Sequence, residues 1–513
     1  MNVIDLNIFS SRIEAVCDEM GAVLRRTAFS PNIRDRLDFS CAIFDVSGAL
    51  CAQAAHIPVH LGSMAYAMGG IVSRMQWRDG EMVVVNDPFL GGTHLPDVTV
   101  IAPLFVADTL AAFVVNRAHH ADIGSDTPGS MPLATTLEEE GVIIAPTVLV
   151  RKGEIDHRLL DELLGEERHE LHGDFAAQVS ANRAGLQRLK ALVESIGIDG
   201  WRRGLDELND YAERLAESAL RTIPDGRYMF QDRLDDDGAG NTGLTIGVTL
   251  EVNQGRIHAD FSGTAAQTRG NVNCPLSVAA AGVYYVLRCL MPPQTPACAG
   301  AFRPITLSAP LGTLLNAQRP AAVAAGNVET STRIVDVICG ALAKALPEAI
   351  PAASHGSMNN LAMGARDVRR WDYYETIGGG MGAGAHGGRL SGVQTHMTNT
   401  LNTPIEVLER HYPLRVRRYA LRKGSGGEGV RRGGDGLIRE FEFLEAAQVT
   451  LLTERRLHAP WGLAGGNDGM RGENRLNGDT LPGKCSLTVK PGDRLTIATP
   501  GGGGWGVEKC KKV

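Results

Sequence analysis

Glycine most constrains what this chain can fold into, because it supplies 61 of the 513 residues. That share is about 12%, whereas average usage is about 7%. The excess predicts many tight turns and many places where one backbone closely approaches another. Hydrophobic residues form 43% of the chain and charged residues 21%, which is ordinary globular usage and predicts a sizeable core. The length fits roughly two to four domains.

Charge and cysteine usage narrow the class of protein. The net charge of -7 argues against nucleic acid or an anionic membrane surface as the main partner. Nine widely spaced cysteines without a CxxC pair are typical of reduced thiols in a cytoplasmic protein. The first residues, MNVIDLNIFSSRIEAV, lack the basic and then apolar run of a secretory signal. No run of about twenty apolar residues occurs, so no membrane span is expected.

Hydrophobic periodicity predicts a mixed α and β fold of several domains. Helical spacing covers residues 5–28, 155–222, 274–291 and 329–346, whereas residues 111–116 and 246–261 have the pattern of buried or half-buried strands. Soft boundaries near 225 and 370 divide the chain into an N-terminal domain with a helical segment (1–225), a β-rich middle domain with helices (226–370) and a Gly-rich and β-rich C-terminal domain (371–513).

A polar ladder lies in the long helical segment. Asp174, Gln178 and Asn182 are four residues apart, so a helix places all three on one face. Such a face either lines a site or is solvated.

The densest cluster of polar residues lies in NDPFLGGTHLPD at 86–97 and NRAHHADIG at 116–124. His94 and Asp97 are three residues apart, and His119 and Asp122 repeat that spacing. A divalent metal needs several nitrogen or oxygen ligands at one point, and His and Asp supply them. Ligation without Cys favours Zn, Mn or Fe at a catalytic site over a structural zinc. The alternative is a set of hydrogen-bonding histidines buried in loops, which four such positions in under thirty residues disfavour.

Other signals are weaker or missing. Asp38 offers another carboxylate, and His56 and His60 offer two imidazoles whose apolar neighbours fit a structural role at least as well. The glycines at 376–388 could hold an anion with backbone amides, although turns are their default explanation. The chain has no GxxxxGK[ST] phosphate loop, no GxGxxG motif between a strand and a helix, and no GxSxG elbow.

Nine long motifs, in order, resemble the hydantoinase B/oxoprolinase family. They lie at 36–45, 52–64, 86–105, 116–132, 260–273, 326–336, 373–383, 391–409 and 421–440. The resemblance implies a hydantoinase B-type fold and one component of a two-component enzyme. A separate A-type partner with an actin-like ATPase fold uses ATP to phosphorylate the substrate. The B-type chain then completes the reaction at its metal, and hetero-oligomers are expected.

The resemblance also implies roles for particular residues. The metal ligands are expected to be Asp38, His94, Asp97 and His119. His120 and Asp122 become acid–base or outer-shell candidates, and Asp87 is expected to order its loop. Since adjacent residues point differently, either His119 or His120 is the ligand, and the choice stays open.

Three functions are consistent with the resemblance. The favoured one is an ATP-dependent hydrolase component for hydantoin, 5-oxoproline or a related lactam. The alternative is the metal-bearing subunit of a carboxylase that acts on an aromatic or aliphatic ketone. The third is a non-catalytic assembly subunit, which the intact His94, Asp97 and His119 argue against.

Overall fold

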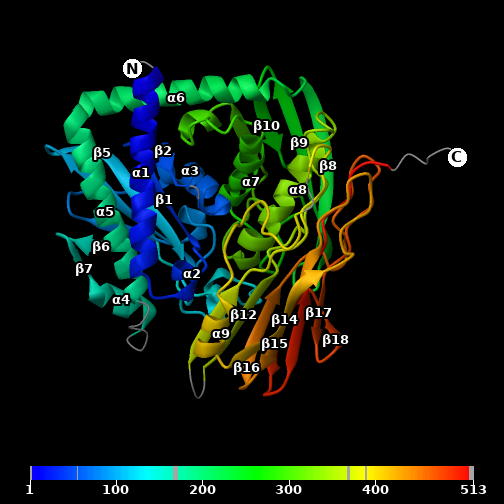
Figure 1. The fold of residues 1–513 in the computed structure, drawn as a ribbon. Helices are drawn as coiled ribbons and strands as arrows, with labels where there is room; N and C mark the ends of the chain where they lie inside the picture. The colour runs from blue at the N-terminus through cyan, green and yellow to red at the C-terminus, as the bar shows by residue number, and fades with distance from the viewer. Residues whose placement is uncertain (1–2, 55, 166–171, 367–369, 388–389, 508–513) are drawn as a thin grey trace.

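The computed structural model describes residues 3–54, 56–165, 172–366, 370–387 and 390–507. Within these ranges the chain forms four β-sheets with helices packed between and against them (Figure 1). The predicted mixed α and β class is therefore confirmed. No helix in the described ranges is both long enough and apolar enough to cross a bilayer. The eight described cysteines are free, and Cys510 lies outside the described residues.

The helices largely follow the predicted ranges. They are α1 (Val3–Thr27), α2 (Pro31–Arg34), α3 (Pro58–Val72), α4 (His157–Leu164), α5 (His172–Ile196), α6 (Ile198–Leu220), α7 (Leu276–Cys289), α8 (Ser331–Leu342) and α9 (Ile405–His411). The helix predicted at 329–346 begins later than expected, because Gly326–Thr330 forms one turn of π-helix before it.

The first sheet has seven strands in the order β2-β1-β5-β4-β3-β6-β7, all antiparallel. Its strands are β1 (Phe39–Phe44), β2 (Leu50–Gln53), β3 (Met82–Val85), β4 (Asp97–Val106), β5 (Thr109–His119), β6 (Thr147–Arg151) and β7 (Glu154–Ile155). Helices α1 and α5 lie side by side over one face of this sheet (Figure 1).

Alternating side chains of β5 explain why both faces of the sheet are covered. Phe113 and Val115 pack in one hydrophobic cluster with Met64 and Met68 of α3. Val114, between them, belongs to the main core that includes α1 and α5. Because successive strand residues point to opposite faces, an entirely apolar strand requires a partner layer on each side.

The second sheet has the order β11-β10-β9-β8, and α8 packs against β8 and β9. Its strands are β8 (Gly226–Asp236), β9 (Thr242–Asn253), β10 (Arg256–Asp260) and β11 (Ile305–Ser308). The predicted strand pair turns at Gln254 and Gly255, both of which have positive φ. Contacts between α3 and α7, and between α7 and α8, join this sheet to the first one.

The C-terminal part forms two sheets around a second core. The third sheet has the order β13-β12-β16-β19 and the fourth the order β14-β15-β20-β17-β18. Their strands are β12 (Asn360–Ala365), β13 (Trp371–Glu375), β14 (Leu414–Arg422), β15 (Gly436–Phe443), β16 (Ala447–Leu452), β17 (Glu473–Leu476), β18 (Asp479–Leu481), β19 (Lys484–Val489) and β20 (Arg494–Ala498). The boundary near 370 stays a prediction, although β12 precedes that residue and pairs with strands beyond it.

The C-terminal glycines pack backbone against backbone. A Cβ at Gly380 would lie 2.0 Å from the Gly434 carbonyl oxygen, and one at Gly502 would lie 2.2 Å from that of Met381. The Gly380 amide donates to the Pro500 carbonyl and the Gly502 amide to that of Gly434. The glycine-rich segments are therefore interlocked loops, and these amides are already used within the chain.

The polar ladder of α5 is a buried face that packs on β4 and β5. Gln178 donates to the Val98 carbonyl and to the Asn116 side chain, each at 2.9 Å. Its side-chain oxygen lies 2.9 Å from Nε2 of His120. Asn182 donates to a β4 carbonyl in the same way. The ladder thus satisfies polar groups inside the sheet–helix interface, which excludes a solvated face.

Gln178→Leu is expected to lower the free energy of unfolding by about 2–4 kcal/mol, because it leaves several buried polar groups unpaired. The matched control is Gln187→Leu, on an exposed position of α5, with an expected change within about 0.5 kcal/mol. Urea unfolding followed by circular dichroism measures both. Equal effects for the two variants would contradict a buried role of the ladder.

Candidate metal centre

Two neighbouring strands place Asp97 and His119 side by side. In the register of β4 and β5, Asp97 pairs with His119, and paired residues of antiparallel strands project from the same face. Asp38 immediately precedes β1 on the other side of β5, and its carbonyl accepts the His119 N–H at 3.0 Å. His94 belongs to the turn that enters β4. The end of three strands thus collects residues from three separate sequence segments.

His94, Asp97 and His119 each bring one potential ligand atom to within 4.8 Å of the others, and all three residues are buried. Nε2 of His94 lies 3.2 Å from Oδ1 of Asp97, but neither atom, nor Nε2 of His119, makes a hydrogen bond of good geometry with a described residue. Buried polar atoms are nearly always hydrogen-bonded, so three exceptions in one cluster require an explanation. Imidazole nitrogens and carboxylate oxygens are usual ligands of divalent transition metals, so the donor set fits such an ion.

The other polar atoms of this cluster are held by the surrounding chain. Nδ1 of His94 lies 3.3 Å from the Ala324 carbonyl oxygen. Oδ2 of Asp97 accepts hydrogen bonds from the Thr93 hydroxyl at 2.5 Å and from the Asn327 amide at 3.2 Å. These bonds orient the side chains of His94 and Asp97 and leave one potential ligand atom of each facing the rest of the cluster. Hydrogen-bond partners orient metal ligands in the same way.

His60 joins the cluster, whereas its apolar sequence neighbours favoured a structural role. Its Nε2 lies 3.2 Å from Oδ1 of Asp97 and 3.9 Å from Oδ1 of Asp38. It occupies the first turn of α3, the helix that covers this face of the sheet. Asp38 lies further out, with Nη2 of Arg36 3.7 Å from its Oδ2. His56 does have a structural place, with its ring edge against Phe39.

The electrostatics of the cluster suit cation binding. Burial by itself would raise the pKa of Asp97, but the imidazoles of His60 and His94 hold that pKa well below its usual range. Burial, together with the neighbouring His94, holds the pKa of His119 well below its usual range. A permanently charged carboxylate beside a neutral imidazole is the protonation state that metal ligation requires.

Comparison with known proteins places the chain in a family. The family model described as Hydantoinase B/oxoprolinase matches residues 2–508. The chain belongs to the hydantoinase B/oxoprolinase family. The resemblance seen in the motifs is thereby confirmed over almost the whole length.

Members of the hydantoinase B/oxoprolinase family share both sequence and fold with this chain. 5-Oxoprolinase 1 of Arabidopsis thaliana is 38% identical over 98% of this chain, which spans 42% of the plant protein. A Pseudomonas protein whose name describes it as the B component of a D-/L-hydantoinase is 32% identical over 98% of this chain and 90% of its own length. Thus the chain spans less than half of the plant relative but nearly all of the bacterial component.

Two solved structures have the same fold. The ATP-dependent caprolactamase of Pseudomonas jessenii has a TM-score of 0.91 at 27% identity, covering 99% of this chain and 91% of its own. An acetone carboxylase has a TM-score of 0.87 at 17% identity, covering 99% of this chain and 76% of its own. The expected hydantoinase B-type fold is therefore confirmed.

A stack of side chains fixes the His119 ring in this hydantoinase B/oxoprolinase-family chain. The ring lies parallel to that of Tyr374 with centroids 4.7 Å apart, and the Arg36 guanidinium lies 4.7 Å from the Tyr374 ring centroid. Nδ1 of His119 contacts the side-chain amide of Asn32 at 3.2 Å. The Tyr374 hydroxyl donates to Asn360 at 2.5 Å. The C-terminal part of the chain therefore closes one side of the cluster.

The loop before His94 is shaped by Asp87 and two glycines. Asp87 caps the short turn Pro88–Leu90 by accepting the Phe89 N–H at 3.0 Å, and it pairs with Arg319. Gly91 has φ of 118°, and a Cβ at Gly92 would lie 2.3 Å from the Asn86 carbonyl oxygen. These contacts are consistent with the expected ordering role of Asp87.

His120 and Asp122 lie away from the three-residue cluster. Because it follows His119 in the chain, His120 points to the opposite face, where it contacts Gln178 and packs against Phe175. Asp122 accepts hydrogen bonds from the Ser130 hydroxyl at 3.1 Å and from Arg370 at 2.6 Å. Of the two adjacent histidines, His119 is therefore the one beside His94 and Asp97.

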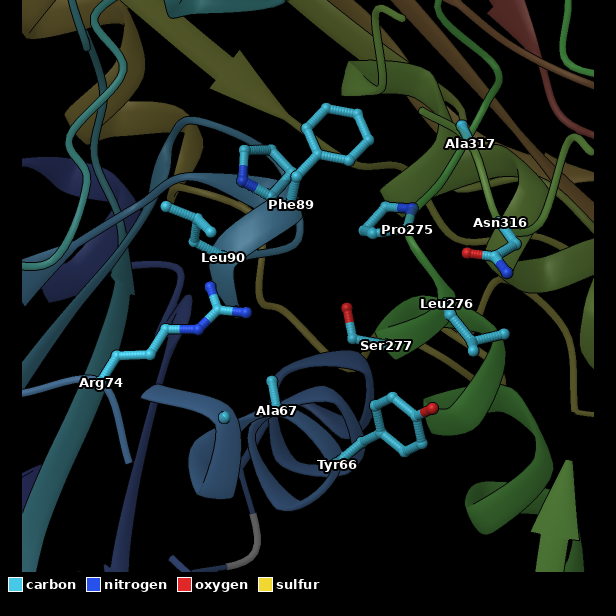
Figure 2. Close-up of a pocket in the computed structure, with 13 residues that line it drawn as sticks. Tyr66, Ala67, Arg74, Phe89, Leu90, Pro275, Leu276, Ser277, Asn316 and Ala317 are labelled. Carbon is cyan, nitrogen blue, oxygen red and sulfur yellow. The ribbon is translucent and has the colours of Figure 1, made fainter. Parts of the chain in front are cut away.

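A pocket of about 370 Å³ adjoins the loop that carries His94. Figure 2 shows Phe89 and Leu90 of that loop across from Pro275 and Ser277 at the start of α7, with Tyr66 from α3 below. The cluster residues are not among those that line it. The Ser277 hydroxyl donates to the Gly92 carbonyl at 3.2 Å, so the pocket wall is bonded to the loop.

A buried acid fixes the backbone that orients His94. Oε1 of Glu140 accepts the N–H groups of Val323 and Ala324 at 2.7 and 2.8 Å, and the Ala324 carbonyl contacts His94. Burial raises the pKa of Glu140 from 4.5 to about 8. Between pH 4.5 and about 8 the folded state keeps the proton on Glu140, whereas the unfolded state has lost it. The stabilising contribution is therefore full below pH 4.5 and is lost as pH rises through about 8.

Glu140→Gln is expected to reduce the fall in unfolding free energy between pH 4.5 and about 8, because glutamine does not titrate. Chemical unfolding at a series of pH values measures this slope. Glu138→Gln, on an exposed neighbour, is the control and is expected to leave the slope unchanged. A wild-type slope retained in full by Glu140→Gln would contradict the protonated state of this acid.

Proposed function

We propose that the chain is the metal-bearing catalytic subunit of a two-component, ATP-dependent hydrolase that opens a cyclic amide. Hydantoin, 5-oxoproline and related lactams are the proposed substrate class. The carrying observation is the convergence of three buried potential ligand atoms, on His94, Asp97 and His119. The names of the relatives support the substrate class, because oxoprolinases, hydantoinases and caprolactamases all act on cyclic amides.

The residues divide into metal ligands and supporting groups. His94, Asp97 and His119 are the proposed ligands. The side chains of Asp38 and His60 are proposed as further ligands. A metal bound there supplies a Lewis acid that polarises a carbonyl or phosphoryl oxygen and lowers the pKa of water. Thr93, Asn327 and the Ala324 carbonyl orient the ligands.

Burial raises the pKa of the Asp38 carboxyl although Arg36 and His60 oppose the shift, and a bound cation would favour the charged form that ligation requires. An acid–base role of His120 and Asp122 stays a prediction. Their contacts with Gln178 and Arg370 support positioning roles for both residues.

An A-type ATPase subunit is the proposed partner. The name of the Pseudomonas relative describes one component of a hydantoinase that has more than one, and the phosphate-loop motif is missing from this sequence. ATP would therefore be used on the partner, which would activate the amide oxygen by phosphorylation. The activated ring would then be opened at the His94 cluster.

Reconstitution tests the proposal. The chain is mixed with an A-type partner, ATP and each of hydantoin, 5-oxoproline and caprolactam, and ring-opened product and ADP are measured. At least one cyclic amide is expected to be opened only when both components, ATP and metal are present. No product from any cyclic amide, with carboxylated product from a ketone and bicarbonate, would favour the carboxylase alternative. Full activity of the partner without this chain would support the third function, a non-catalytic assembly subunit.

A further inference from the structure

Three arginines line one pocket of about 640 Å³ in the C-terminal part of the chain. Arg422 ends β14, Arg456 follows β16, and Arg471 precedes β17. Arg422 and Arg456 are half-buried, whereas Arg471 is exposed. Three separate segments thus bring positive charge to one pocket, apart from the residues of the metal cluster.

Neutral oxygens, not carboxylates, bind these guanidinium groups. Arg422 donates through Nη1 to the carbonyls of Arg471 and Thr499, at 2.6 and 3.2 Å. Arg471 donates through Nη1 to the Leu457 carbonyl at 3.2 Å. Their Nη2 groups make no hydrogen bond with any described residue, so donors remain for a ligand.

Arg456 is the most firmly held of the three. It donates to the side-chain oxygens of Asn359 at 2.7 Å and Asn474 at 2.9 Å, and to the Glu454 carbonyl at 2.6 Å. A Cβ at Gly472 would lie 2.8 Å from its central guanidinium carbon, so a side chain at position 472 would displace the guanidinium. In the described part of the chain, none of the three arginines has a carboxylate within 4.0 Å.

Two acids also line the pocket, but other cations already pair with them. Glu473 lies 2.6 Å from Arg475, which does not line the pocket. Asp236 accepts the Gly238 N–H at 2.8 Å and lies 3.9 Å from Nζ of Lys484. Glu473 acts on Arg422 from a distance, and Asp235, Glu329 and Glu454 act in the same way on Arg456, but none of these carboxylates forms an ion pair with the three arginines.

We propose that this pocket binds a small oxyanion of the phosphate class, either free phosphate or the phosphate group of a small molecule. Guanidinium groups match the oxygens of phosphate with paired donors, and three of them suit an anion with several charged oxygens. The volume is in the range of small-molecule sites and leaves room for more than a lone phosphate. The pocket is a partly open hollow of small-molecule size, which suits a small anion, and an acidic peptide is the alternative that the experiment tests. This site is independent of the proposed hydrolase function.

Calorimetry and thermal unfolding of the full chain test the site. The probes are inorganic phosphate, pyrophosphate and glycerol phosphate, with chloride at matched ionic strength as the reference. Wild type is expected to bind at least one probe and to unfold at a higher temperature in its presence. Arg422→Gln and Arg471→Gln are each expected to weaken binding about tenfold or more, because each removes a charged hydrogen-bond donor.

Lys423→Gln is the matched control, since it removes one positive charge beside Arg422 from an exposed residue that does not line the pocket. Its affinity is expected to remain within about twofold of wild type. If Arg422→Gln fails to fold, Arg471→Gln still tests the site, because Arg471 is exposed and its loss is expected to leave the fold intact. Binding of glycerol phosphate but not phosphate identifies an organic phosphate as the source of the oxyanion. No binding of any probe, or equal binding by Arg471→Gln and wild type, overturns the proposal, as does binding only of an acidic peptide.

Discussion

Asp97→Asn is expected to weaken divalent-metal binding at least about 100-fold. Loss of a residue that only hydrogen-bonds to a metal ligand typically costs about 10–100-fold, and loss of a ligand costs more. Asp97 is the one carboxylate in the tight group with His94 and His119. The substitution keeps the shape of the side chain but removes the negative charge that holds a cation. Asparagine can still accept hydrogen bonds from Thr93 and Asn327, so the fold is expected to survive.

Two measurements separate this loss of metal from a loss of structure. Added Zn, Mn or Fe is expected to raise the unfolding temperature of metal-free wild type and to leave that of Asp97→Asn unchanged. ATP-dependent ring opening by the reconstituted complex is expected to fall with metal affinity. Asp35→Asn, at the surface ion pair with Arg34, is the control and is expected to behave as wild type. Equal metal affinity in Asp97→Asn and wild type would remove Asp97 from the ligand set.

Arg333→Met is expected to lower the free energy of unfolding by about 3 kcal/mol, because it removes one of the two cations that pair with Asp232, which keeps Arg455, and one of the two that pair with Glu454. Arg333 is fully buried, with Nη1 3.1 Å from Asp232 and Nη2 3.2 Å from Glu454. Lys484 lies 2.6 Å from the same Glu454 and would compensate only part of the loss. This network joins β8 and α8 to the C-terminal sheets across the predicted boundary near 370.

Arg256→Met provides the matched comparison. Arg256 contacts Glu213 and Glu217, but its side chain is 61% exposed, and such a pair contributes about 0–1 kcal/mol. The midpoint of urea unfolding is therefore expected to shift clearly for Arg333→Met and hardly for Arg256→Met. Similar shifts in the two variants would show that burial of the network does not decide its contribution.

Local patterns predicted much of the fold because they depend on neighbours in sequence. The spacing of apolar residues predicted α1, and the alternation around Gln254 and Gly255 predicted the β9–β10 hairpin. The π-helix at Gly326–Thr330 was missed, because nothing in the local periodicity separates it from the following helix. Strand order was also beyond reach, since it is set by contacts between distant segments.

The candidate site was partly predictable for the same reason. His94 and Asp97 are close in sequence, and the β4–β5 register pairs Asp97 with His119. The place of His60 in the cluster was not predictable, because it depends on α3 crossing the same face of the sheet. Strand alternation could have separated His119 from His120, once the end of β5 was known to reach His119.

The metal content of the purified chain, measured by elemental analysis of wild type beside His94→Ala, tests the central claim most directly. About one Zn, Mn or Fe per chain is expected in wild type, and its loss is expected in His94→Ala. Removing one imidazole takes away one of the three converging ligand atoms, so the remaining ligands are expected to hold an ion too weakly to retain it through purification. Wild type that stays empty after each metal is offered, or His94→Ala that retains the full content, would contradict a metal centre at His94, Asp97 and His119.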